Sequence, residues 1–159
     1  MPDAPALHLT AIDTHAHVFS RGLNLASERR YAPSYDAPLG DYLGQLLAHG
    51  FSHGVLVQPS FLGTENRYLL SALQTVPGQL RGVVMLEQDV ERETLDEMAR
   101  LGVRGVRLNL MGQALPDLTG AQWRPLLERI GEQGWHLELH RHVADIPALV
   151  RALEPYGLD

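Results

Sequence analysis

A fivefold alternation of strand-like and helix-like segments constrains the fold of this chain more than any other feature. Short runs rich in Val, Ile and Leu have the length of strands, and segments with apolar residues at helical spacing follow them. The strand-like runs are 10–18, 54–60, 81–86, 105–110 and 136–141, and the helical segments are 39–49, 65–76, 91–101, 120–133 and 146–154. Consecutive units of this kind predict a parallel sheet joined by right-handed crossovers.

Glycine punctuates the repeat at regular intervals. A glycine follows each helical segment, where a left-handed residue commonly ends a helix, at Gly50, Gly78, Gly102, Gly134 and Gly157. Eight units of roughly 27 residues approach the size of a closed (β/α)₈ barrel. The chain is therefore expected to be of the α/β class and of the (β/α)₈ TIM-barrel type, of which it supplies about the first five units.

Two architectures fit the repeat. One is an open, doubly wound sheet of five strands, and the other is the N-terminal portion of a barrel that stops before a sixth strand. We expect the second, with residues 1–159 as a single domain. The uncovered edge strands of such a portion favour a longer polypeptide or pairing with a second copy, so a homo-oligomer is one expectation.

Composition narrows the class of protein. The 159 residues carry a formal net charge of −6 and include neither cysteine nor lysine. These facts exclude disulfides, thiolate metal sites, Schiff-base chemistry and a lysine-derived metal bridge, and they give no basic patch for nucleic acid. No apolar run reaches the ~20 residues of a membrane span, and the N-terminus lacks a signal-peptide pattern. We expect a cytoplasmic protein with neither a nucleic-acid nor a membrane partner.

Histidines stand where buried parallel strands should be apolar. By simple alternation Asp13, His15 and His17 share one face of the run 10–18, and His140 ends the run 136–141. The carboxyl ends of such strands carry the chemistry of α/β folds, so these three histidines are predicted catalytic residues and metal ligands. A hydrogen-bonded core role is the alternative. We expect structural roles for His8, His49, His53 and His136. His142 is expected to lie in a loop.

Arginine and hydroxyl side chains near the same strand ends suggest an anionic substrate. A guanidinium at the end of an internal strand requires an anionic partner, and a dicarboxylate would supply one. The predicted substrate-binding residues are Arg107, Arg141, Tyr31, Tyr35 and Ser60, whereas "ERRY" (28–31) is expected on the surface.

Four motifs carry a family resemblance. "IDTHAHVF", "GVLVQPSFLGTENRYLLSAL", "GVRGVRLNL" and "LELH" together resemble the amidohydrolase superfamily, in its amidohydrolase-related family. "VQPSFLGTEN" and the loop "RRYAPSYDAPL" are similar to the branch that contains 2-pyrone-4,6-dicarboxylate and sugar lactonases. The resemblance covers essentially the whole chain.

The resemblance implies a barrel with His15 and His17 as its first-strand pair and His140 as its fifth-strand histidine. It implies one divalent metal ion (Zn or Mn) or none, since the binuclear members need a lysine that is absent here. A sixth-strand histidine and an eighth-strand aspartate, the general base, usually complete the site. The expected function is a hydrolase that opens the lactone ring of 2-pyrone-4,6-dicarboxylate in aromatic catabolism. The alternatives are a metal-dependent decarboxylase of aromatic acids and an inactive scaffold.

Overall fold

Five parallel strands form one sheet in their order along the chain. The computed structural model describes residues 8–158. Its strands are β1 (Ile12–Ala16), β2 (His53–Val57), β3 (Leu80–Val84), β4 (Val103–Asn109) and β5 (His136–His140). Each strand pairs with the next, which gives the sheet order β1-β2-β3-β4-β5.

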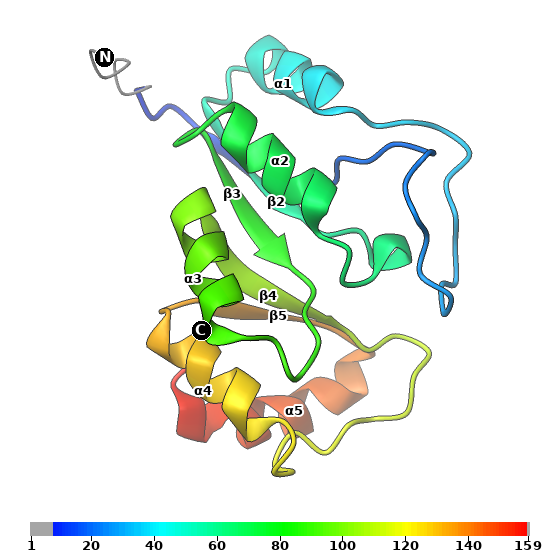
Figure 1. Cartoon of the computed structure of the whole chain (residues 1–159), viewed down its shortest axis with the longest axis vertical. Coiled ribbons are helices and arrows are strands. Elements are labelled where there is room, and N and C mark those ends of the chain that lie inside the picture. Colours follow the sequence, from blue (N-terminus) through cyan, green and yellow to red (C-terminus); the bar gives the residue numbers. More distant parts are fainter. Residues whose placement is uncertain (1–7, 159) are drawn as a thin grey trace.

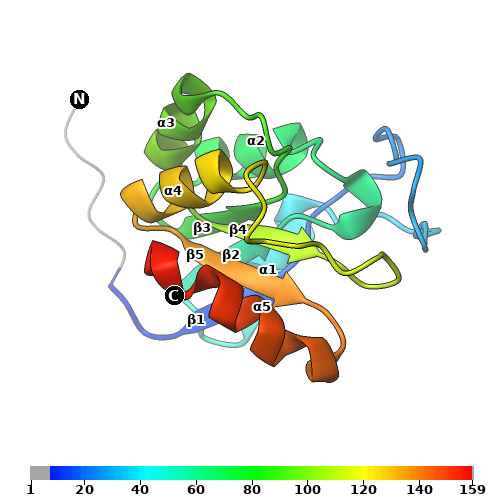
Figure 2. The same ribbon diagram turned by 90° about the horizontal axis from the view of Figure 1, so that it is seen from below.

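Helices follow the strands in turn. They are α1 (Leu39–Ala48), α2 (Arg67–Thr75), α3 (Arg92–Leu101), α4 (Arg124–Glu132) and α5 (Ile146–Leu153), with short 3₁₀ helices η1 (Ser60–Leu62), η2 (Val143–Asp145) and η3 (Glu154–Tyr156). Helices α2, α3 and α4 lie side by side along one face of the sheet (Figures 1 and 2). Among the described residues, no helix has the length and hydrophobicity that a membrane crossing needs.

The strand order decides between the two predicted architectures. A doubly wound sheet reverses its order at a switch point, so that its first strand lies inside the sheet. Here β1 and β5 are the two edges of the described sheet, and every crossover moves one strand in the same direction. The doubly wound alternative is therefore wrong, and the five units form a half-barrel, as the barrel prediction required.

Strand register sorts apolar from polar side chains. On β4 and β5, Val106 pairs with Leu137 and Leu108 pairs with Leu139, and all four side chains pack in the hydrophobic core beneath the helices. The alternate pair, Arg107 with Glu138, must then face away from the helices, because side chains alternate along a strand. Polar side chains of β4 and β5 thus lie on the inner, concave face of the half-barrel.

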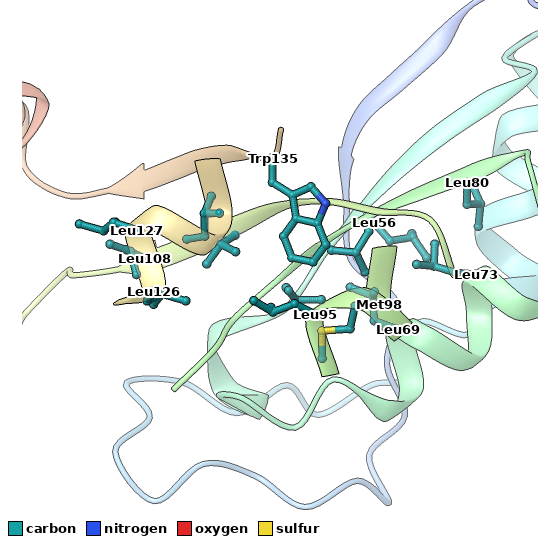
Figure 3. Packing of buried hydrophobic residues seen from close by; sticks show 14 of the residues in the cluster. Leu56, Leu69, Leu73, Leu80, Leu95, Met98, Leu108, Leu126, Leu127 and Trp135 are labelled. Atoms are coloured by element: carbon teal, nitrogen blue, oxygen red, sulfur yellow. The ribbon is translucent and has the colours of Figure 1, made fainter. Parts of the chain in front are cut away.

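The core between sheet and helices is continuous. Figure 3 shows the indole of Trp135 between Leu126 and Leu127 of α4 on one side and Leu95 and Met98 of α3 on the other. Trp135 stands directly before β5, so its burial joins that strand to two neighbouring helices.

Most predicted boundaries differ from the structure by a few residues. All five punctuating glycines have positive φ, as predicted. Helix α4 begins at Arg124 rather than near residue 120, and Pro125 occupies its first turn, where the missing N–H costs least. Asp145 precedes α5, and its side chain makes no capping hydrogen bond but accepts one from Arg141.

Leucine truncation in two helices provides a test of this core. Leu95 of α3 is 0% exposed, whereas Leu47 near the end of α1 is 83% exposed. We expect Leu95→Ala to lower the free energy of unfolding by about 2–5 kcal/mol, because it leaves a cavity. Leu47→Ala is the matched control and should change it by less than about 0.5 kcal/mol. Urea denaturation measures both, and equal losses would contradict the assigned core.

Candidate active site

The inner face of the half-barrel brings together side chains from its two edge strands. The Nδ1 atom of His15 on β1 lies 3.9 Å from Oε1 of Glu138 on β5, although these strands are at opposite edges of the sheet. Only strong curvature of the sheet permits this contact. The carboxyl ends of β1, β4 and β5 therefore surround one concave surface, which is where α/β barrels hold their reacting groups.

Asp13 does not share the face of His15 and His17, which corrects the alternation predicted for the first strand. The pairing of β1 with β2 shifts register between Asp13 and Ala16, so simple alternation fails there. The Asp13 carboxylate instead accepts a hydrogen bond of 3.0 Å from the hydroxyl of Tyr42 on α1. Burial and this hydrogen bond raise the pKa of Tyr42.

His17 is oriented by the backbone of the neighbouring strand. Its Nδ1 lies 2.7 Å from the carbonyl oxygen of Val57, and because a carbonyl only accepts, Nδ1 carries the hydrogen. The Nε2 lone pair is then available for a proton or for a hydrogen bond. Burial lowers the pKa of His17, against the opposing effect of the Val57 hydrogen bond, so the ring is neutral near pH 7.

His140 is oriented the opposite way by Arg107. The Nη2 atom of Arg107 donates a hydrogen bond of 2.9 Å to Nδ1 of His140, since a guanidinium has no acceptor. In the neutral ring the hydrogen is therefore on Nε2, which can donate to a ligand. Burial lowers the pKa of His140, and the charge of Arg107 lowers it further.

Arg107 is the most unusual group of the site. It is 9% exposed, and its Nε and Nη1 atoms are buried with no hydrogen-bond partner among the described residues. Buried donors left without partners cost about 1–3 kcal/mol each, more for charged groups. Burial lowers the pKa of Arg107 and the charge of Glu138 opposes this effect. An anion bound at this position would accept hydrogen bonds from Nε and Nη1 of Arg107 and balance its charge.

Glu138 was missed as a candidate, although its position between His136 and His140 in an alternating run was a visible signal. Its carboxylate lies 4.0 Å from Nε2 of His136, on the side where it also meets His15. Burial raises the pKa of Glu138, but the hydrogen bond from His136 and the charges of His15 and Arg107 lower it by more. An ionised carboxylate thus balances part of the positive charge of the inner face.

The three histidines predicted as metal ligands have different partners in the structure. The rings of His15 and His17 are 5.1 Å apart edge to face, but Nδ1 of His140 is bound by Arg107. Between residues 8 and 158 no three His, Cys, Asp or Glu side chains are arranged to hold a metal ion. The metal ion and its predicted ligands His15, His17 and His140 therefore stay a prediction.

Arg141 lies apart from this group. Its Nε donates to the Asp145 carboxylate at 2.7 Å, and its Nη1 donates to the carbonyl oxygens of Leu110 and Gln113. These bonds fasten the segment after β5 to the loop after β4. The structure therefore gives Arg141 a role in holding two loops together, and substrate contact by Arg141 stays a prediction.

The predicted tyrosines lie in the loop after β1. Tyr31 packs edge-on against Phe61, and Tyr35 packs against Phe19. Both tyrosine side chains remain more than half exposed. A hydrogen bond between the two hydroxyls raises the pKa of Tyr31. They belong to a small aromatic cluster at the rim of the sheet, and their contact with a substrate stays a prediction.

Ser60 lines two neighbouring cavities beside the strand ends, of about 870 and 300 Å³. The loop that carries it is shaped by buried Gln58, which donates to the carbonyl oxygens of Gly63 and Glu65. Arg30 also lines the smaller cavity. It is exposed, as expected for "ERRY", yet its position beside the site was not anticipated.

The fold and this inner face define the class of protein. The sequence model of the amidohydrolase family matches residues 12–157, so the chain belongs to that family. Among solved structures it is similar to a Pseudomonas putida protein assigned as a 2-pyrone-4,6-dicarboxylic acid hydrolase, with 90% identity, a TM-score of 0.90, and coverage of 96% of this chain and 56% of that one. An Acinetobacter baumannii protein with the same assignment, solved with citric acid bound, has 40% identity, a TM-score of 0.91, and coverage of 94% and 56%.

A curated relative carries the same activity in its name. The 2-pyrone-4,6-dicarboxylate hydrolase of Comamonas testosteroni is 30% identical over 152 residues, which are 93% of this chain and 50% of that protein. The chain spans about half the length of the curated relatives it matches.

The tautomer and charge assignments predict how His140 titrates. We expect the pKa of His140 to lie below its usual 6.5 and to rise in Arg107→Met, which removes a positive charge and a donor to Nδ1. Imidazole ¹H–¹⁵N NMR across a pH series measures both effects. Arg104→Met is the matched control, since Arg104 lies on the other face of β4 and donates to a backbone carbonyl. An unchanged His140 titration in Arg107→Met would contradict the assignment.

The same shifts fix the sign of the pH dependence of stability. His17 and His140 both have a folded-state pKa below 6.5. As the pH falls through 6.5 the unfolded chain binds protons that the folded state does not, so these groups make stability decline toward acid.

Proposed function

We propose that this chain contributes the anion-binding half of an active site that hydrolyses a lactone, with 2-pyrone-4,6-dicarboxylate as the substrate. The observation that carries the proposal is buried Arg107, whose Nε and Nη1 have no partner among residues 8–158 beside the oriented ring of His140. The names of the relatives support the substrate, and a relative with bound citric acid supports recognition of several carboxylates.

In the proposed reaction, water adds to the ring carbonyl carbon and the bond from that carbon to the ring oxygen breaks. The former ring oxygen leaves as an enolate and takes up a proton to give an enol, while the new carboxyl group releases a proton and ends as a carboxylate. Negative charge develops on the carbonyl oxygen as water adds, so donors aimed at that oxygen accelerate the step.

The oriented histidines suit opposite parts of this step. Nε2–H of His140 donates to the developing oxyanion, because Arg107 occupies Nδ1 of the same ring. Nε2 of His17 has a free lone pair and accepts a hydrogen bond from the attacking water. Arg107 holds a carboxylate of the substrate with its remaining donors, as guanidinium groups commonly do.

Removing Arg107 tests the proposal. The protein used for the test is a chimera that joins this chain to the remaining part of the 90% identical P. putida relative. We expect the chimera to open the ring of 2-pyrone-4,6-dicarboxylate, followed by loss of the pyrone absorbance, and Arg107→Met to raise KM at least tenfold, about 1.4 kcal/mol of lost binding. Arg104→Met, on the opposite face of β4, is the control and should leave KM unchanged. An unchanged KM in Arg107→Met would remove Arg107 from the substrate site, and release of CO₂ instead of ring opening would favour a decarboxylase.

Comparing the chain alone with the chimera tests the contribution of the other half. The family resemblance implies a general base on an eighth strand, and loss of a general base costs ~10² to 10⁴ in rate. We expect the 159-residue chain to turn over the pyrone at least about a hundredfold more slowly than the chimera. Equal rates would place the base among the residues described above.

A further inference from the structure

A polar cavity of about 300 Å³ lies at the end of β4, beside Asn109, and takes no part in the proposed reaction. Its walls come from the loop after β1, the start of η1 and the end of β4, and they include Glu28, Arg30, Ser60, Asn109 and Gln113. Asn109 stands two residues after Arg107 on the same face of β4, so the cavity continues the inner face of the half-barrel.

Arg30 is a cation without an anion. Among residues 8–158 no carboxylate lies within ion-pair distance of its guanidinium, and it donates no hydrogen bond there. Arg21 in the same loop is different, because it pairs with Asp36 at 3.1 Å. The stem of Arg30 passes close to the backbone of Gly112, where an added Cβ would lie 3.4 Å from Cδ of Arg30.

Arg30 and Arg107 both contribute positive charge to this end of the inner face. The positive charge of Arg30 adds to burial in lowering the pKa of both Arg107 and His140. Glu138 faces His15 and His136, and Glu28, which lines the cavity, is not paired with Arg30. The guanidinium of Arg30 is exposed, so it can turn toward an anion bound in the cavity.

The side-chain amide of Asn109 also lines this cavity. Its oxygen is buried with no hydrogen-bond partner among the described residues and only accepts, so it suits a donor such as a hydroxyl, and the amide nitrogen is the group that can donate to an anion. Ser60 supplies a hydroxyl to the same cavity and can both donate and accept. The cavity thus offers a cation, a hydroxyl and an amide beside the proposed carboxylate site at Arg107.

We propose that Arg30, with Ser60 and Asn109, forms a second anion subsite that binds the second acidic group of a small diacid whose first carboxylate is held by Arg107. The inference rests on the proposed function for the role of Arg107 and extends it to the choice between diacids and monoacids. Arg30 is the specificity-determining residue, since it supplies the charge that a monoacid leaves unpaired.

Equilibrium binding to the chimera tests the subsite without turnover. The probes are benzene-1,3-dicarboxylate and benzoate, which differ by one carboxylate and contain no lactone. Calorimetry should show the diacid binding at least tenfold more tightly than benzoate. Arg30→Gln should abolish most of this preference by weakening the diacid at least tenfold and benzoate less than threefold. Arg107→Met should weaken both probes.

Arg21→Gln is the matched control, because it removes the same charge from the same loop outside the cavity. It should leave both affinities unchanged, and melting temperatures should show that all variants fold. The subsite is wrong if Arg30→Gln behaves like Arg21→Gln, or if it weakens both probes equally. Diacid preference without opening of the pyrone ring would overturn the proposed function while the subsite stands. Ring opening by the chimera, with no effect of Arg30→Gln on diacid binding, would overturn the subsite while the proposed function stands.

Discussion

The site depends on the curvature of the sheet. The contact between His15 and Glu138 across the concave face shows that this curvature is strong. In a flat sheet β1 and β5 would be separated by three strands, and their side chains could not lie 3.9 Å apart. The curvature follows from packing every crossover helix on one side, with leucines and Trp135 filling the space between. The same packing leaves the other face of the sheet to polar side chains. The core and the site therefore both follow from the alternation of side chains along the strands.

Charge on the inner face is unbalanced in a way that suits an anionic ligand. Arg107 and Arg30 are cations without carboxylate partners in the part of the chain described, and Glu138 is engaged with histidines. Burial and these cations keep His17 and His140 neutral near pH 7, which preserves one ring as an acceptor and the other as a donor. A neutral histidine pair beside arginines that have no carboxylate partner suits the binding of an anionic ligand.

Family membership and site geometry support the proposal in different ways. The match over residues 12–157 establishes the amidohydrolase family, and the relatives that share about half their length with this chain carry lactone hydrolase names. The roles of Arg107, His140 and Arg30 rest instead on hydrogen bonds, burial and charge in this chain. The proposed roles of these three residues can therefore fail in experiment while the family membership stands.

The sequence by itself determined the five strand–helix units, the left-handed glycines and the inward direction of Arg107, because these follow from local periodicity and strand alternation. It did not determine the displaced start of α4, the exposure of Leu47 or the register shift that turns Asp13 toward Tyr42, because neighbouring elements decide these. Only the tertiary structure placed Glu138 against His15, tied Arg141 to Asp145 and brought Arg30 beside Arg107. Some of these contacts join residues far apart in the chain, and in others a long side chain has several partners within reach. Sheet curvature and loop packing decide which contacts form.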